Sequence, residues 1–430
     1  MRSDLPKVLH PVASLPMIRH VTAACAALLP ERILVVVSPQ SEAVQKAVEP
    51  DRCVVQRRPL GTGDAVKAAA DELKSFSGDI LVLAGDAPLI TAESLQGLRD
   101  KRAETGAAMV VAGFVPPDPA AYGRLILDAA GKLTAIVEAK DATPEQRAVT
   151  LCNSGVMLFE AKKLWPLLDK LRDDNTQREF YLTDCIALAR AEGWDCAVAT
   201  VPAADFLGIN TRVELAEAEK LMQQRLRRRA MLQGATLTDP DSVTLATDTV
   251  IGRDVTIGPH VVIGAGVTIA DRVEIKAFCH LEQVRVEAGA IIGPFARLRP
   301  GSSVGENAHI GNFVEIKNTD VGKGAKINHL SYIGDASIGA KANIGAGTIT
   351  CNYDGFRKSR THVGAETFIG SNTALVAPVN VGDGAYVGAG SVITMDVPAN
   401  TLAVARSRQA NIEDWATRYR ELKTRGNKEG

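Results

Sequence analysis

Asp86 is the first candidate for chemistry in this sequence, because it stands directly after an apolar run. The segment Ala84-Gly-Asp-Ala-Pro88 continues Ile80–Ala84, a run typical of a buried strand. A carboxylate at such a strand end is a reasonable Mg²⁺ ligand, since Mg²⁺ takes one or two carboxylates together with phosphate oxygens. The alternative is that Asp86 only caps the following turn, and the residue pattern leaves both interpretations open.

A second candidate is the turn Leu60-Gly-Thr-Gly-Asp64, which follows one predicted strand and opens a predicted helix. Backbone amides at a helix start can bind an anion or the edge of a base. Taken alone, a Gly-Thr-Gly turn favours a plain structural role. Five further segments have the composition of ordinary polar loops, at 122–124, 136–140, 152–155, 179–184 and 208–210.

Strands and helices must alternate to position these segments. Four short apolar runs are predicted strands, at 33–37, 53–55, 80–84 and 108–112. Helical patterns lie between them, at 41–48, 64–73 and 92–102. This alternation predicts an α/β domain with a mostly parallel sheet, in which ligands bind at the carboxyl ends of the strands.

A long amphipathic helix is predicted over Val213–Leu232, with Gly234 beyond its end. It carries a basic cluster, Arg225 and Arg227–Arg229. This cluster favours a solvated helix face over a nucleic-acid site. A further helix is predicted at 412–422.

The second half of the sequence repeats with a period of six residues. Aliphatic side chains recur at this step from Leu245 to Leu281, from Ile292 to Ile316 and from Val363 to Ile393, with one-residue slips at Val321 and Ile338. Each unit predicts a short strand and a turn, so the units stack into a β-helix with coils about 4.8 Å apart. The segment 350–362 leaves the repeat, and an insertion in a solenoid tends to carry function.

Bulk properties exclude several classes of protein. A formal net charge of −1 argues against a dedicated binder of nucleic acid or of membrane surfaces. The seven cysteines are scattered without a CxxC pair, which favours reduced thiols over disulfides or a zinc site. The longest early apolar run, Val21–Leu29, is far shorter than the ~20 residues of a membrane span and lacks the basic start of a signal peptide. We therefore expect a cytoplasmic protein.

The whole sequence resembles the bacterial bifunctional enzymes that are both N-acetylglucosamine-1-phosphate uridyltransferase and glucosamine-1-phosphate acetyltransferase. The most specific motifs are Ser3–His10, Gly293–Gly301, Gly311–Lys317, His329–Tyr332, Asn343–Thr348 and Cys351–Gly355. The resemblance implies a Rossmann-like nucleotidyltransferase domain at 1–212, a linker helix at 213–234, a left-handed parallel β-helix at 235–405 and a tail at 406–430. It also implies a homotrimer that supplies UDP-N-acetylglucosamine for cell-wall synthesis.

For acetyl transfer, the resemblance implies that His329 is the general base and that Glu315 orients it. An imidazole suits this task because it can be neutral and basic near neutral pH. Arg299 and Lys317 would bind the phosphate of glucosamine 1-phosphate. The remaining roles implied are the sugar site for Tyr332, Asn343 and Lys358, the amine or the oxyanion for Asn352 and Tyr353, and acetyl-CoA for Ala346, Ser371, Ala389 and Arg406.

For uridylyl transfer from UTP, the resemblance implies that Asp86 and Asn210 hold Mg²⁺ and that Lys7 faces phosphates. Phosphoryl transfer of this kind needs charge neutralisation more than covalent help. Gln56, Gly61 and Thr62 would recognise the uracil. The N-acetylglucosamine part would be held by Tyr122, Gly123, Glu138, Asn153, Tyr181 and Thr183.

The sequence departs from the family pattern at its start. The family begins with an apolar strand and a Gly-rich loop that ends in Gly-Thr-Arg-Met, and this sequence starts at what corresponds to that Met. We therefore expect an incomplete α/β sheet with an open central slot. Smaller departures are Pro59, Asp64 and Ala84, where relatives have Gln, His and Tyr.

Three alternatives to the bifunctional enzyme are open. An acetyltransferase with an inactive nucleotide domain would release thiol from acetyl-CoA but no pyrophosphate from UTP. A regulatory protein without activity would release no thiol and would lose no function on His329→Ala, and the presence of His329, Asn352 and Arg299 argues against it. A pyrophosphorylase whose β-helix serves only assembly would lack His329 and the Cys351–Gly355 motif.

Overall fold

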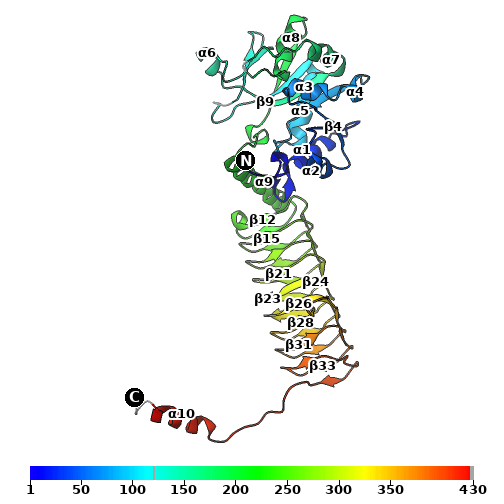
Figure 1. Cartoon of the computed structure of the whole chain (residues 1–430), viewed down its shortest axis with the longest axis vertical. Helices are drawn as coiled ribbons and strands as arrows, with labels where there is room; N and C mark the ends of the chain where they lie inside the picture. The colour runs from blue at the N-terminus through cyan, green and yellow to red at the C-terminus, as the bar shows by residue number, and fades with distance from the viewer. Residues whose placement is uncertain (120–121, 176, 427–430) are drawn as a thin grey trace. The chain divides into compact units, whose positions relative to one another are not determined.

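The computed structural model describes residues 1–119, 122–175 and 177–426 (Figure 1). The chain forms two compact units. One unit holds Met1–Arg228 with Leu245–Thr247, and the other holds Arg229–Thr244 with Asp248–Gly430. The long helix α9 covers Arg212–Leu232.

The first unit is built on a six-stranded sheet with the order β10-β6-β9-β7-β8, in which β5 also pairs with β9. Strand β10 runs parallel to β6, but β9 runs antiparallel to β5, β6 and β7. The predicted mostly parallel sheet is therefore wrong, because β9 lies between β5 and β6 with the opposite direction. The strands are β5 (Asp79–Val82), β6 (Met109–Phe114), β7 (Arg124–Leu127), β8 (Leu133–Val137), β9 (Cys152–Glu160) and β10 (Cys196–Thr200).

Helices cover both faces of this sheet. Alternate residues of β6 enter two separate apolar clusters, so that Met109 and Val111 face α7 and α8, while Val110 and Ala112 face α5. The predicted strands are confirmed, and the helix predicted at 64–73 is divided in two. The helices are α1 (Met17–Ala26), α2 (Glu42–Ala47), α3 (Thr62–Lys67), α4 (Ala70–Leu73), α5 (Ala92–Thr105), α6 (Pro144–Arg147), α7 (Ala161–Lys170) and α8 (Cys185–Ala191).

Strands β3 (Leu34–Val37) and β4 (Arg52–Val55) form a parallel two-stranded sheet of their own. A cavity of about 1220 Å³ is lined by apolar residues of β3 and of β5, among them Val35, Val37 and Leu81. Its lining also includes polar side chains from the loops that the sequence singled out. The first unit therefore offers a large space with one apolar part and one polar part.

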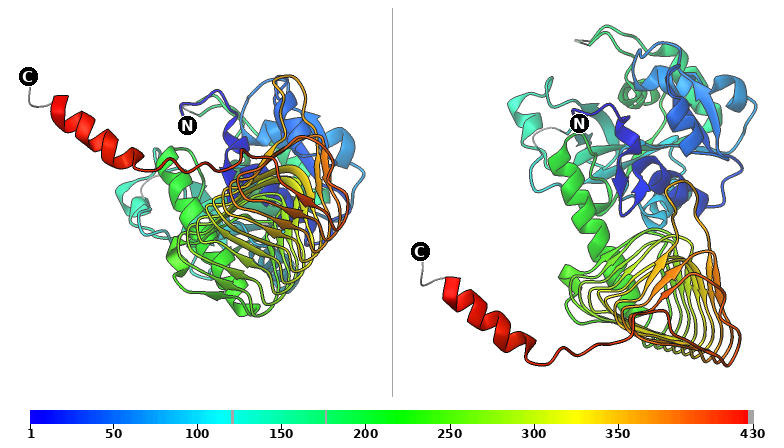
Figure 2. Two further views of the ribbon diagram at one scale, coloured as in Figure 1. Left: turned by 90° about the horizontal axis from the view of Figure 1, so that it is seen from below. Right: turned by 60° about the horizontal axis from the view of Figure 1, so that its bottom comes forward.

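The second unit is a parallel β-helix, whose coils lie one behind another in Figure 2. One face is a ten-stranded sheet from β11 (Thr236–Leu237) to β35 (Leu402–Ala403). A fifteen-stranded sheet forms the rest, since β24 (Glu315–Val321) and β26 (Tyr332–Ile338) each pair with strands of two columns. The predicted aliphatic ladder points inward, and all of the following side chains on the ten-stranded face are at most 2% exposed: Ile257, Ile275, Ile292, Ile310, Ile327, Ile344, Ile369 and Val387.

Changes in coil length explain the slips in the repeat. In most of the N-terminal coils, residues that lie opposite each other on neighbouring coils are 18 apart in the sequence, as Arg253 and Asp271 are. Around the predicted acetyl site the step shortens to 17, as between Asn312 and His329. It lengthens to 25 between Ser337 and His362, where the loop at 350–360 leaves the coil. A change of one residue in coil length changes which side chains lie opposite each other on neighbouring coils.

One corner of the β-helix carries an exposed aromatic stack. His260, Phe278, Phe295 and Phe313 succeed one another along it, with neighbouring ring centroids 4.9, 4.9 and 5.2 Å apart. Each of these residues has a positive φ between 54° and 60°, a conformation that most residues avoid. Stacking of the rings offsets part of that strain.

The remaining elements are few. Helix α10 (Trp415–Gly426) corresponds to the helix predicted at 412–422. All seven cysteines are free, as predicted, and four of them are buried. Among the helices in the described part of the chain, none has the length and apolarity that crossing a membrane requires.

Candidate functional sites

In the first unit, Lys7, Asp86 and Asn210 meet although they are far apart in the sequence. The Lys7 ammonium donates to Asp86 Oδ2 and to Asn210 Oδ1, the latter at 3.0 Å. The backbone holds the two acceptors together, since the Ile209 amide donates to the Asp86 carbonyl at 3.0 Å. Two oxygens thus converge on one cationic group.

The Gly-Thr-Gly turn is fixed against the segment at 180–182. The Gly63 amide donates to the Phe180 carbonyl at 2.8 Å, and the Leu182 amide donates to Thr62 Oγ1 at 3.0 Å. Gly61 has a φ of 107°, and a Cβ there would lie 2.7 Å from the Phe180 carbonyl oxygen. Only glycine allows this approach. Gln56 donates through Nε2 to the Gly61 carbonyl at 3.2 Å and to Asp64 at 2.8 Å.

The cavity of the first unit brings together six residues of the predicted nucleotide-sugar site, namely Gln56, Thr62, Glu138, Asn153, Tyr181 and Thr183. Burial, assisted by Asp141 and Asp184, raises the pKa of Glu138. Gly123 lies beside that carboxyl, because a Cβ on it would be 3.4 Å from Glu138 Oε2. The Asn153 amide donates to the Gly123 carbonyl at 2.8 Å. Tyr122 packs edge-on against Phe114, with ring centroids 4.9 Å apart.

In the β-helix, His329 ends strand β25 (Lys326–His329) with an exposed imidazole. Its Nδ1 lies 2.8 Å from Oδ1 of Asn312, which is on the preceding coil. An amide oxygen can only accept, so Nδ1 carries a proton and Nε2 is the basic nitrogen. Asn312 is a residue that the sequence analysis missed.

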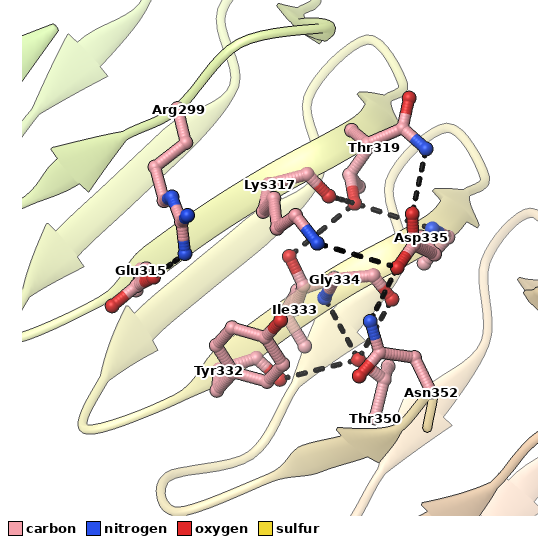
Figure 3. A network of polar contacts seen from close by, with 12 residues as sticks. Arg299, Glu315, Lys317, Thr319, Tyr332, Ile333, Gly334, Asp335, Thr350 and Asn352 are labelled. Carbon is pink, nitrogen blue, oxygen red and sulfur yellow. Dashed lines mark hydrogen bonds and ion pairs between the residues drawn. The ribbon is translucent and has the colours of Figure 1, made fainter. Parts of the chain in front are cut away.

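Glu315 pairs with Arg299, whose Nη1 donates to Glu315 Oε1 at 2.8 Å (Figure 3). Within the described residues no hydrogen bond joins Glu315 to His329. The orienting partner seen here is Asn312, and the orienting role of Glu315 stays a prediction.

Asp335 lies at the centre of the polar network in Figure 3 and was also missed from the sequence. Its Oδ1 accepts from Asn318 Nδ2 at 2.6 Å, and its Oδ2 accepts from Asn352 Nδ2. The Lys317 ammonium is 3.8 Å from the same Oδ2. The network thus connects Lys317 and Asn352, two residues of the predicted sugar-phosphate site.

Tyr332, Tyr353 and Lys358 come from the strand and the loop that carry this network, whereas Asn343 belongs to the ten-stranded sheet. The Tyr332 ring lies over Gly334, where a Cβ would be 2.4 Å from the Tyr332 hydroxyl oxygen. Lys358 extends from the 350–360 loop, and its contact with the like-charged ammonium of Lys317 lowers the pKa of Lys358. Tyr353, bridged to Lys358 across the loop, donates to the Gly355 carbonyl at 2.5 Å. Asn343 lies on β27 (Asn343–Ile344), in register with Lys326 of the preceding coil.

The predicted acetyl-CoA residues continue the column of His329. Ala346, Ser371 and Ala389 lie two residues after Ile344, Ile369 and Val387 of successive strands, as His329 lies two residues after Ile327. The carbonyls of Ala346 and Ser371 accept from the amides of the next coil at 2.7 and 2.8 Å. The Arg406 guanidinium donates to the Ala389 carbonyl at 2.9 Å and so ends the column.

Along the corner that carries the aromatic stack, the type of residue changes at the coil of His329. On the coils that precede His329 in the sequence, this corner is occupied by Phe278, Phe295 and Phe313. On the coil of His329 it is occupied by Leu330. On the coils that follow, the corresponding residues are Gly347, Asn372 and Gly390, all with positive φ. Glycine and asparagine at these positions carry shorter side chains than the phenylalanines of the preceding coils.

Family models match both units. The MobA-like NTP transferase domain matches residues 1–182. The bacterial transferase hexapeptide model matches residues 248–283 and 284–318, and the hexapeptide repeat of succinyl-transferase matches residues 360–395.

Similar proteins share nearly the whole chain. The bifunctional protein GlmU of Paramagnetospirillum magneticum is 56% identical over 421 residues, which cover 98% of this chain and 94% of the relative. The protein of the same name from Ruegeria is 53% identical over 96% of this chain and 92% of its own length. The one from Zymomonas mobilis is 46% identical over 98% and 95% of the two chains. The chain belongs to the family of the bifunctional protein GlmU.

Proposed function

We propose that this chain makes UDP-N-acetylglucosamine in two steps. The β-helix transfers an acetyl group from acetyl-CoA to the amine of glucosamine 1-phosphate. The first unit then transfers a uridylyl group from UTP to N-acetylglucosamine 1-phosphate and releases pyrophosphate. Membership of the GlmU family supports both activities, and the two units with their separate clusters of polar residues match two separate reactions.

The exposed imidazole of His329 supports the following acetyl step. The neutral amine of the sugar attacks the thioester carbonyl carbon, His329 Nε2 accepts the amine proton, and the C–S bond breaks to release coenzyme A. The hydrogen bond from Nδ1 to Asn312 keeps Nε2 free for that proton. Arg299, Lys317 and Lys358 provide the positive charge that the sugar phosphate requires.

One observation carries this proposal, namely the continuous column from His329 through Ala346 and Ser371 to Ala389. With coils about 4.8 Å apart, the column extends about 14 Å from the base. An extended thioester arm can lie along it, with its carbonyl end beside the imidazole. The guanidinium of Arg406 at the far end suits the phosphates of coenzyme A.

His329→Ala tests the acetyl step. Free thiol released from acetyl-CoA should fall by ~10²–10⁴-fold, the usual loss when a general base is removed. Pyrophosphate release from UTP on the same protein is the internal control and should stay unchanged. Near-full acetyl transfer by the variant would contradict the assigned base.

For uridylyl transfer we propose that Asp86 and Asn210 hold Mg²⁺. The residues fit this ion, because both oxygens already converge on the cationic group of Lys7. When bound, Mg²⁺ supplies charge neutralisation at the phosphates of UTP. The chain itself contributes the Gly61–Thr62 turn and Gln56 toward the uracil, and Glu138 and Asn153 toward the sugar.

We also propose that the protein is a homotrimer in which acetyl sites lie between subunits. Phe278, Phe295 and Phe313 are 50%, 46% and 55% exposed, and an aligned apolar stack of this kind marks a surface that associates. Phe295→Glu should reduce the mass measured by light scattering from three chains to one. Met395→Glu, at an exposed apolar residue outside the stack, is the control. An unchanged mass for the Phe295 variant would contradict the use of this surface.

A further inference from the structure

Asp335 occupies a position that sequence motifs do not mark, under the proposed acetyl site. It is 7% exposed, and Asn318, Asp335 and Asn352 succeed one another at intervals of one 17-residue coil. The carboxylate therefore lies in the middle of a three-residue polar ladder (Figure 3). Because such a group is rarely buried without partners, each of its contacts has structural meaning.

The chemistry of the ladder fixes the orientation of Asn352. An ionised carboxylate only accepts hydrogen bonds, so each asparagine must turn its amide nitrogen toward Asp335. Although burial opposes ionisation, the hydrogen bonds from Asn318 and Asn352 and the charge of Lys317 lower the pKa of Asp335. With Nδ2 of Asn352 directed at Asp335, Oδ1 of Asn352 is left to accept from a ligand.

This orientation separates the two tasks considered for Asn352. A tetrahedral oxyanion needs a hydrogen-bond donor, whereas the amine of glucosamine 1-phosphate offers N–H donors. An Asn352 that presents its oxygen is suited to the amine. The same carboxylate pairs with Lys317, and with Lys358 nearby the three groups keep a net positive charge for the sugar phosphate.

We propose that Asp335 is a positioning residue, which directs the Asn352 carbonyl oxygen to the acceptor amine and holds the Lys317 ammonium for the phosphate. The inference rests on the proposed acetyl transfer to glucosamine 1-phosphate. It assigns Asp335 to recognition of the acceptor and leaves acetyl-CoA binding to the column of Ala346 and Ser371.

Asp335→Asn tests the proposal with the least disturbance. Asparagine tolerates the positive φ of 49° at this position better than alanine does. Asparagine at position 335 offers one oxygen and one nitrogen where the carboxylate offered two acceptors, so Asn318 and Asn352 can no longer both donate to it. When the new oxygen keeps the bond from Asn318, the new nitrogen faces Asn352, and Asn352 flips to present Nδ2 to the amine. We expect KM for glucosamine 1-phosphate to rise at least about 10-fold, because two donors then face each other. KM for acetyl-CoA should change less than about twofold.

A double variant, Asp335→Asn with Asn352→Asp, exchanges the two side chains and gives the second test. The amide introduced at position 335 would donate to the carboxylate introduced at position 352, whose second oxygen again faces the amine as an acceptor. We expect this double variant to recover most of the lost KM for glucosamine 1-phosphate. The exchange also tests the proposal if the single variant does not fold.

Asn318→Gly is the matched control. It removes one hydrogen bond to Asp335, keeps a backbone that accepts a φ of 45°, and leaves Asn352 and Lys317 in contact with the carboxylate. Its KM for glucosamine 1-phosphate should stay near that of the natural chain.

Three outcomes would overturn the inference: an unchanged KM in Asp335→Asn, an equal rise in Asn318→Gly, or no recovery in the exchange variant. Absence of thiol release from the natural chain would instead overturn the proposed function, so the two failures are distinguishable.

Discussion

Asn312 Oδ1 lies 2.8 Å from Nδ1 of His329, with one 17-residue coil between them. The residue that orients the proposed base is thus a neutral amide. A neutral partner fixes the tautomer but adds little stabilisation to the imidazolium that forms when the base accepts a proton. This contact makes the pH dependence of acetyl transfer adjustable at one position.

Asn312→Asp should move the acidic limb of the pH–rate profile for acetyl transfer to higher pH. A carboxylate beside Nδ1 stabilises the protonated imidazole, so the neutral base is available only at higher pH. The profile is measured from thiol release under saturating substrates, with Asn307→Asp, at an exposed residue on another corner of the β-helix, as control. An unshifted limb in Asn312→Asp would show that His329 does not limit the rate.

Asp86→Ala should abolish Mg²⁺-dependent pyrophosphate release, with a loss of at least ~10²-fold, because the charge of the phosphates loses its proposed metal. Acetyl transfer should be unaffected. Binding of Mn²⁺, followed by electron paramagnetic resonance, gives a readout that does not depend on turnover and should weaken in parallel. Equal loss of both activities would mean that Asp86 has a structural role.

Ser371→Trp should obstruct the column that leads to His329. The Gly390 amide bonds to the backbone carbonyl of Ser371, so the substitution leaves the coil contact intact. We expect KM for acetyl-CoA to rise at least ~10-fold while uridylyl transfer is unchanged, since an indole ring fills space that the thioester arm needs. Ser303→Trp, on the fifteen-stranded sheet, is the control. Similar kinetics for both variants would place the thioester elsewhere.

The repeat allowed the aliphatic ladders of the β-helix core to be predicted, because inward residues such as Ile310 and Ile327 recur at a fixed step. Contacts across coils could not be predicted in the same way. Asn312 meets His329, and Asn318 meets Asp335, only because these coils have 17 residues and not 18. A difference of one residue changes every partner, and the hexapeptide pattern locates the slip without giving the pairing.

In the first unit, apolar runs were sufficient to locate β3 to β6 but not to give the direction of their neighbours. Strand β9 is buried on both sides over Val156–Phe159, and such a run has no feature that distinguishes parallel from antiparallel pairing. The meeting of Lys7 with Asp86 and Asn210 likewise depends on chain segments 79 and 203 residues apart. The position after an apolar run could mark Asp86, whereas Lys7 and Asn210 could be marked only through the family resemblance.

The buried thiols should resist alkylation in the folded protein. Burial raises the pKa of Cys185 to about 12 and that of Cys279 to about 11. The thiolate is the reactive form, so at pH 8 only a small fraction of each group can react, and that fraction grows as the pH approaches the raised pKa. Mass spectrometry after iodoacetamide treatment at pH 8 should find Cys185 and Cys279 unmodified in the native protein. All seven cysteines should react in guanidinium chloride, because unfolding removes the burial that raises these pKa values. Modification of Cys279 at the same rate in both conditions would contradict a closed β-helix core at that coil.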